Sequence, residues 1–149
     1  MLYRFIVAFI LIALAHSAQA GPWLREKGTT FTTVSVTGTY FLDTTSQTYV
    51  EYGLTSETTL IADIGMSHLY LGAVGGSATF SVRRALSAPD AVSKWAYDVG
   101  VGASWTDVMN KPHLRTALSW GKGIEVREKT GWVTVEAATI WDINDAQHI

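Results

Sequence analysis

Residues 95–105 read Trp-Ala-Tyr-Asp-Val-Gly-Val-Gly-Ala-Ser-Trp, and their alternation is the strongest indication of the fold. Odd-numbered positions carry apolar side chains with a tryptophan at each end, whereas even-numbered positions are small or polar. A period of two predicts a β-strand with one apolar and one polar face. The stretch has about the 9–11 residues that a tilted strand needs to cross a bilayer. Aromatic residues at both ends of an apolar face are typical of a strand that faces lipid, with a polar lumen behind it.

The same alternation recurs along the chain, in segments rich in threonine, valine and aromatic residues, which strands favour. Strands are expected over residues 29–42, 47–54, 57–66, 77–87, 95–105, 113–121 and 131–143. Turns are expected at Thr55–Glu57, Ala88–Asp90 and Asn110–Pro112, and a longer loop over Ser67–Gly76. The prediction is therefore an all-β protein: an antiparallel up-and-down meander forming a partial or open β-barrel of about 7–8 strands.

The N-terminus has the features of a signal peptide. Arg4 supplies a positive charge, residues 5–15 are apolar, and Ala18-Gln19-Ala20 is a small-x-small cleavage site. The apolar run is shorter than the ~20 residues of a spanning helix. We expect residues 1–20 to be removed on export and residues 21–149 to form one transmembrane β-barrel domain.

Composition excludes several classes of function. The chain has no cysteine, and therefore no disulfide, thiolate metal site or thiol nucleophile. Its net charge is −2 without a basic patch, so nucleic acid is not an expected partner. Gly75-Gly76 is not followed by the Lys-Ser/Thr pair of a phosphate loop, and no cofactor is predicted.

Alternation also occurs in soluble sandwiches and lipocalin-like barrels, where the apolar face points inward. Two features favour lipid on the apolar side. The chain is only 16% charged, whereas outer faces of soluble sheets are usually rich in lysine and glutamate. The mid-strand charges also fall on the polar face, where a lumen would hold them; Arg84, near a strand end, is the exception. The candidate lumen residues are Glu51, Asp63, Arg83, Asp98, Arg115 and Glu136. The candidate interfacial aromatic residues are Trp95, Trp105, Trp120, Trp132 and Trp141.

Two segments carry a resemblance to a known class of proteins. Residues 49–60 read Tyr-Val-Glu-Tyr-Gly-Leu-Thr-Ser-Glu-Thr-Thr-Leu, and residues 21–28 read Gly-Pro-Trp-Leu-Arg-Glu-Lys-Gly. The first resembles a strand–turn–strand pattern, and the second a Trp-x-x-x-Lys-Gly lead-in, of bacterial outer-membrane β-barrel proteins of porin-like, uncharacterised type. The resemblance implies a Gram-negative outer membrane as the location and outer-membrane lipid as the partner. It names no substrate.

The chain departs from this class in one respect. Such barrels use an even number of strands and usually end in an aromatic residue, whereas seven strands and a polar end are read here. An open sheet would leave two unpaired edges in lipid, which the bilayer does not tolerate. Three explanations stay open: an unrecognised strand, an N-terminal part of a longer barrel, or self-association that closes the barrel. We favour the incomplete barrel as the expectation.

Little catalytic chemistry is indicated. Ser67, His68 and Asp107 could meet on the loop side, as in a rim hydrolase, but no motif supports a nucleophile–base pair. The histidines match no metal-ligand spacing. Asp63 and Asp98 could pair as carboxylates, although Arg83–carboxylate and Arg115–Glu136 contacts are the more ordinary use. The expected function is a structural or passive small-solute transport role in the outer membrane, not an enzyme. The alternative is a soluble periplasmic β-barrel or sandwich that binds an apolar ligand.

Overall fold

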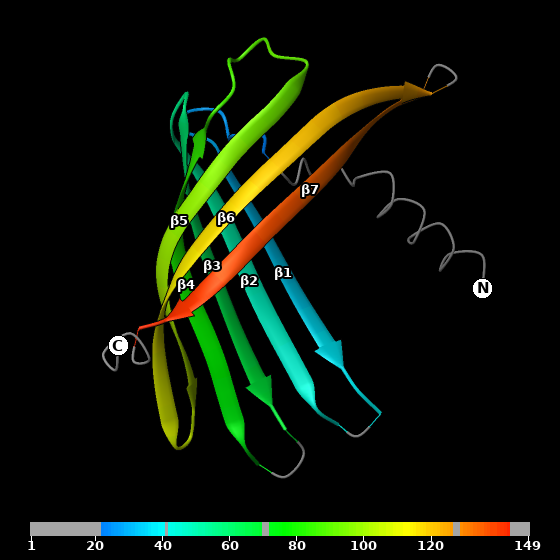
Figure 1. Ribbon diagram of the computed structural model, residues 1–149. Coiled ribbons are helices and arrows are strands. Elements are labelled where there is room, and N and C mark those ends of the chain that lie inside the picture. The colour runs from blue at the N-terminus through cyan, green and yellow to red at the C-terminus, as the bar shows by residue number, and fades with distance from the viewer. Residues whose placement is uncertain (1–21, 41, 70–71, 127–128, 144–149) are drawn as a thin grey trace, which may run out of the picture.

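The computed structural model describes residues 22–40, 42–69, 72–126 and 129–143, and every element in this part is a β-strand (Figure 1). The signal peptide predicted for residues 1–20 lies outside these residues. The strands are β1 (Thr30–Gly38), β2 (Thr44–Thr55), β3 (Thr58–His68), β4 (Val74–Ala85), β5 (Ser93–Thr106), β6 (Met109–Val126) and β7 (Lys129–Asp142). They form one sheet in the order β1-β2-β3-β4-β5-β6-β7, and every neighbouring pair is antiparallel. The all-β, up-and-down prediction is confirmed: the sheet is an open, curled half-barrel.

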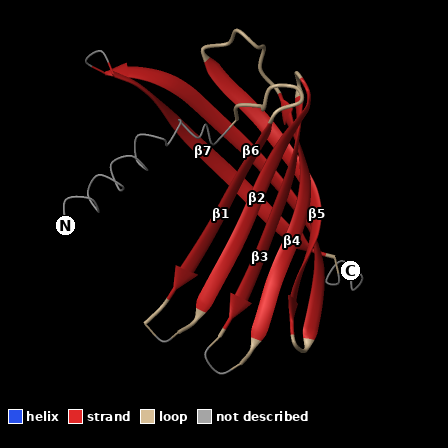
Figure 2. Ribbon diagram, turned by 180° about the vertical axis from the view of Figure 1, so that it is seen from behind, coloured by secondary structure: helices blue, strands red, loops and turns tan. Residues whose placement is uncertain are grey.

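The turns gather at two ends of the curled sheet (Figure 2). The β2–β3 turn at Ser56 and Glu57 lies at one end, and the two-residue β5–β6 turn at Asp107 and Val108 lies at the other. Neighbouring strands keep one continuous register, with a single shift between Gly53 and Thr55 on β2. Because side chains alternate across each strand, this register sorts them onto a concave and a convex face.

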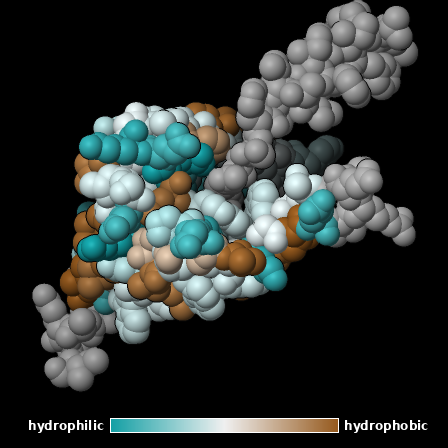
Figure 3. Space-filling model, turned by 90° about the horizontal axis from the view of Figure 1, so that it is seen from above, coloured by the Kyte–Doolittle hydropathy of each residue, from teal (hydrophilic) through white to brown (hydrophobic). Residues whose placement is uncertain are grey.

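The polarity of the two faces is the reverse of that in a soluble sheet. The concave face, onto which Glu51, Arg83 and Asp98 point, buries charged and hydroxyl side chains. The convex face carries apolar residues that are largely exposed, such as Val34 (66%), Val101 (58%) and Val135 (60%). Seen from above, apolar side chains lie around the outside of the curled sheet (Figure 3). The faces predicted for residues 95–105 are therefore those observed.

Two predicted connections differ from the observed ones. Gly75 and Gly76 belong to β4, so the predicted long loop is confined to the residues between His68 and Val74. Asn110–Pro112 was expected to break the chain but lies inside β6. The Pro112 carbonyl accepts a hydrogen bond from the Ile143 amide (3.1 Å), so the backbone nitrogen of Pro112 also faces β7. The β6–β7 ladder ends at this position, and a proline without an N–H is therefore tolerated there.

Close approach of β5 to its neighbours depends on two glycines of the opening stretch. A Cβ added to Gly100 would lie 2.7 Å from the Phe80 carbonyl oxygen and would also collide with Ser81. A Cβ added to Gly102 would lie 2.7 Å from the His113 ring and from the Thr79 hydroxyl. Glycine lets the concave surface of β5 curl tightly against β4 and β6.

We expect Gly100→Ala to lower the free energy of unfolding by about 1–3 kcal/mol, because the added methyl group overpacks a site closed by backbone atoms. Gly123→Ala is the matched control, since a Cβ there meets nothing within 4 Å, and its effect should stay within about 0.5 kcal/mol. Urea unfolding in detergent, followed by tryptophan fluorescence, measures both. Equal midpoints for the two variants would show that the curl does not depend on Gly100.

Candidate functional site

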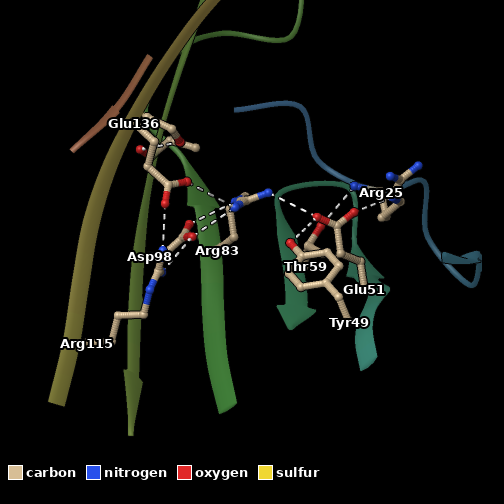
Figure 4. A network of polar contacts seen from close by, with 10 residues as sticks. Arg25, Tyr49, Glu51, Thr59, Arg83, Asp98, Arg115 and Glu136 are labelled. Carbon is tan, nitrogen blue, oxygen red and sulfur yellow. Dashed lines mark hydrogen bonds and ion pairs between the residues drawn. The ribbon is translucent and has the colours of Figure 1, made fainter. Parts of the chain in front are cut away.

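Arg83 on β4 is the centre of a charged network on the concave face (Figure 4). Its guanidinium binds Asp98 on β5 through two parallel bonds, Nε to Oδ1 at 2.8 Å and Nη2 to Oδ2 at 2.9 Å. The Nη1 atom donates to Glu51 Oε1 on β2 at 3.2 Å, and Nη2 lies 3.8 Å from Glu136 Oε2 on β7. One side chain, 5% exposed, therefore holds carboxylates from three other strands. Paired, bidentate contacts of this kind are the strong form of a charged hydrogen bond.

Arg115 on β6 extends the network toward β7. Its Nη2 atom donates to Glu136 Oε1 at 2.6 Å, and its Nη1 atom to Asp98 Oδ2 at 3.4 Å. Asp98, which is almost fully buried, is thus shared between two arginines. The Arg115–Glu136 contact and the Arg83–carboxylate contacts proposed from the sequence are present.

A third arginine closes the other end of the network. Arg25, which precedes β1, forms an ion pair with Glu51 through Nε, and its backbone amide donates to Thr59 Oγ1 at 2.9 Å. The Tyr49 hydroxyl donates to Glu51 Oε1 at 2.6 Å. Three arginines thus face three carboxylates, so the network balances its charges; we call it the charged ladder: Arg25, Glu51, Arg83, Asp98, Arg115 and Glu136. Among the described residues, no buried side-chain nitrogen or oxygen is left without a partner.

The segment that carries Arg25 crosses the concave face as a strap, which we define as residues 22–26. On the β2 side it lies on Gly53, where an added Cβ would be 2.8 Å from the Arg25 carbonyl oxygen. On the β6 side it lies on Gly121, where a Cβ would be 2.7 Å from the Trp23 ring. Trp23 also meets the ring of Trp132 on β7 edge-on, with centroids 5.9 Å apart. The strap therefore spans the lumen at the end of the sheet that carries the β2–β3 turn.

Beyond the charged ladder, the other end of the concave face is hollow. The cavity there has a volume of about 870 Å³. Its lining is rich in hydroxyl side chains and in glycine, and includes Thr45, Gln47, Asp63, Ser67, Ser77, Thr79, Ser104 and His113. This end offers hydrogen bonds and room for water, beside apolar surface from Ile61, Trp105 and Ile140.

Five of the six predicted lumen residues belong to the charged ladder, and Asp63 does not. Asp63 accepts two bonds from the Gln47 amide, at 2.9 and 3.2 Å, and belongs to the lining of the cavity. The suggested pairing of Asp63 with Asp98 is not formed, because Arg83 and Arg115 occupy Asp98.

The five predicted interfacial tryptophans take different positions. Trp95 and Trp120 are cross-strand partners with ring centroids 6.5 Å apart. The Trp105 ring lies against Gly76, and Trp141 donates from its indole N–H to Thr116 Oγ1 at 3.2 Å. Trp132 lies on the same, concave face of β7 as Glu136, and its ring contacts Trp23 of the strap. Their position relative to a membrane stays a prediction.

Sequence reasoning placed Tyr49 on the inward face but missed Arg25, Trp23 and His113 there. His113 is buried, with its Nε2 atom 3.1 Å from Thr79 Oγ1. Its odd number on β6, in phase with Arg115, could have indicated the concave face. Arg25 and Trp23 precede the first strand, so no alternation marks them.

The described residues do not assemble the catalytic or metal chemistry considered above. Ser67 Oγ lies 3.3 Å from Thr45 Oγ1, and Asp107 accepts a bond from the Val74 amide at 3.1 Å. No hydrogen bond in this part of the chain links Ser67 or Asp107 to His68. Within the same residues, no group of three or more histidine and carboxylate side chains is placed to hold a metal ion.

Comparison of the chain with protein-family models, with curated proteins and with solved structures gives no match in any of the three. In the part of the chain that the structure describes, no helix has the length and hydropathy to cross a membrane. A functional hypothesis therefore has to come from the residues of the sheet itself.

Replacing Arg83 by methionine should lower the free energy of unfolding by about 3–5 kcal/mol, because the buried Glu51 and Asp98 would lose the cation that they share and three carboxylates would face two arginines. Arg84→Met is the matched control: Arg84 is the next residue, 57% exposed, and its 3.9 Å pair with Glu57 is worth less than about 1 kcal/mol. Adding Asp98→Asn to the Arg83 variant should recover part of the loss, since it removes one buried charge. Denaturant unfolding of the four chains tests this, and equal losses at positions 83 and 84 would contradict a structural role for the ladder.

Proposed function

We propose that this chain is a β-barrel protein with a structural role in a bacterial outer membrane. Its N-terminal signal peptide would direct its export to that membrane. The observation that supports this most is the reversed polarity of the sheet, with charges buried on the concave face and valine, leucine and aromatic residues exposed on the convex face. In water, an apolar surface that extends over all seven strands would far exceed the few hundred Å² that soluble monomers usually expose. In hydrocarbon the same surface needs no cover, and the polar groups belong inside.

The depth dependence of charge in a bilayer supports the same proposal. An arginine at the lipid face near the midplane costs about 2–4 kcal/mol. Arg115 lies in the inner half of β6 and Arg83 lies two residues from the end of β4; both point to the concave side, where carboxylates bind them. Arg84 faces the other side but lies one residue from the end of β4, where its side chain can reach a headgroup.

A structural role fits the lumen better than an open pore. The charged ladder and the strap lie across one end of the concave face, with contacts that run from β2 to β7. Barrels of about eight strands have interiors that are just wide enough for their own side chains. Small solutes could enter the hollow end, but the ladder blocks their way through. An apolar ligand in the cavity would also leave its charged and hydroxyl lining groups without hydrogen-bond partners, which disfavours a soluble periplasmic binding protein.

The absence of cysteine makes a labelling test of the membrane proposal direct. Single cysteines are placed at a convex cross-strand pair, Phe80→Cys or Val101→Cys, and at a concave pair, Ser77→Cys or Ser104→Cys, and each carries a small fluorophore. In reconstituted vesicles, brominated acyl chains should quench the convex labels, because these face lipid. Iodide in the water should quench the concave labels instead.

A mature chain that stays monomeric in buffer without detergent, with its convex labels open to iodide, would refute the membrane proposal. Heat-modifiable migration on gels and recovery with the outer-membrane fraction are the supporting results expected from the same preparations.

Conductance separates the structural role from passive transport. We expect the purified protein to leave a planar bilayer electrically silent, because the charged ladder and the strap obstruct one end of the lumen. A steady ohmic current that scales with protein concentration would contradict the structural role and favour small-solute passage.

A further inference from the structure

The two outer strands of the sheet, β1 and β7, leave one edge each without a strand beside it in the described part of the chain. All six ladders are antiparallel, so β1 and β7, which are separated by five strands, run in the same direction. A direct β1–β7 contact would therefore be a parallel seam. A second copy inserted the same way in a membrane would also meet this chain by parallel seams, because rotation about the barrel axis preserves strand direction. An interposed single strand is the simplest arrangement that makes both new ladders antiparallel.

The width of the lumen limits how many strands can fit. Arg83 contacts carboxylates from β2, β5 and β7 at distances of 2.8–3.8 Å, so one side chain reaches around the lumen. An interior filled in this way is that of a barrel of about eight strands. Twice seven strands would approach the porins, whose interiors leave a water channel. Such a barrel would separate Glu51 and Glu136 beyond the reach of a single guanidinium.

We propose that the gap between β7 and β1 accepts one amphipathic β-strand, antiparallel to both. Its length would be about ten residues, to match the hydrocarbon core. Its outward residues would be apolar, like Val34 on β1 and Val135 on β7. Its inward residues would be small and uncharged beyond the level of Phe31, because the charged ladder is already balanced and the inward residues of β1 that follow are Thr33, Ser35 and Thr37. This inference rests on the proposed membrane barrel, because in lipid each unpaired edge amide and carbonyl costs several kcal/mol.

Hydrogen bonds at the ends of β1 and β7 determine which amides would receive this strand. The Gly53 amide donates to the Thr29 carbonyl (3.0 Å) and the Thr39 amide to the Asp43 carbonyl (2.9 Å), so odd-numbered residues of β1 face β2. The amides of Thr32, Val34 and Val36 therefore face the gap. On β7 the Ile143 amide donates to the Pro112 carbonyl, so the backbone amides of odd-numbered residues face β6. The amides of even-numbered residues, such as Thr134 and Ala138, therefore face the gap.

Hydrogen exchange of the full chain in detergent micelles, read at single amides by NMR, tests the proposal. The probe is a synthetic peptide of five Val-Thr repeats with a lysine at each end. The control peptide has the same composition, with valines and threonines in separate blocks. The alternating peptide should slow exchange at the gap-facing amides of both β1 and β7 by roughly tenfold or more, at one peptide per chain. Val34→Pro removes one gap-facing N–H and should abolish this protection on β1, whereas Val34→Ala should retain it.

Several results would overturn the proposal. Gap-facing amides that are already protected in a monomer without peptide would mean that β1 and β7 pair directly. The same protection in a dimer would mean that a second copy closes the sheet. Protection of one edge alone, or equal protection by the control peptide, would mean that the gap is not one strand wide. A failure of the membrane proposal is distinguishable, because the chain would then be soluble without detergent.

Discussion

The guanidinium of Arg83 holds carboxylates from β2, β5 and β7 around one point, and the curvature of the sheet depends on this geometry. A flat sheet would place Glu51 and Glu136 on strands five positions apart, far beyond the reach of one side chain. Curling brings them together, and the curl in turn requires that the concave surface be small between the charges. Gly100 and Gly102 on β5 meet this requirement, since any side chain there would collide with β4 or with His113. Charge pairing and glycine placement are thus two parts of one constraint.

The same constraint explains why the strap belongs to the fold. Glu51 accepts bonds from Tyr49 and Arg83, and the Arg25 side chain supplies a second cation to this buried carboxylate. Without that cation, the ladder would hold three carboxylates against two arginines. Because the strap also packs Trp23 between Gly121 and Trp132, one segment fixes both the charge balance and the distance between the two sides of the half-barrel.

Local alternation was enough to predict the strands and the faces, because a period of two is a property of each segment by itself. The faces of Asp98, Arg115 and Glu136 follow from their positions in the alternation. Their ion-pair partners cannot be predicted from the alternation. These partners depend on how strongly the sheet curls and on the height along the barrel axis at which each side chain lies. Asp63 was predicted on the correct face but belongs to another level, beside Gln47. Pro112 was misassigned because its tolerance depends on the phase of the β6–β7 ladder, which no local pattern reveals.

A lumen filled by its own charges restricts both the size of the barrel and its use. A wider barrel would move carboxylates away from Arg83 and weaken the pairing of buried charges, which costs folding free energy. The ladder therefore favours a number of strands close to the present one. In the proposed membrane barrel, charges that could make a wide channel selective would instead hold a narrow lumen together. In that barrel the hollow end, with its hydroxyl-rich lining, would be a blind vestibule whose floor is the ladder. Neutralising a ladder residue would therefore loosen the fold before it opened a path, which places stability and permeability of this sheet under the control of the same few side chains.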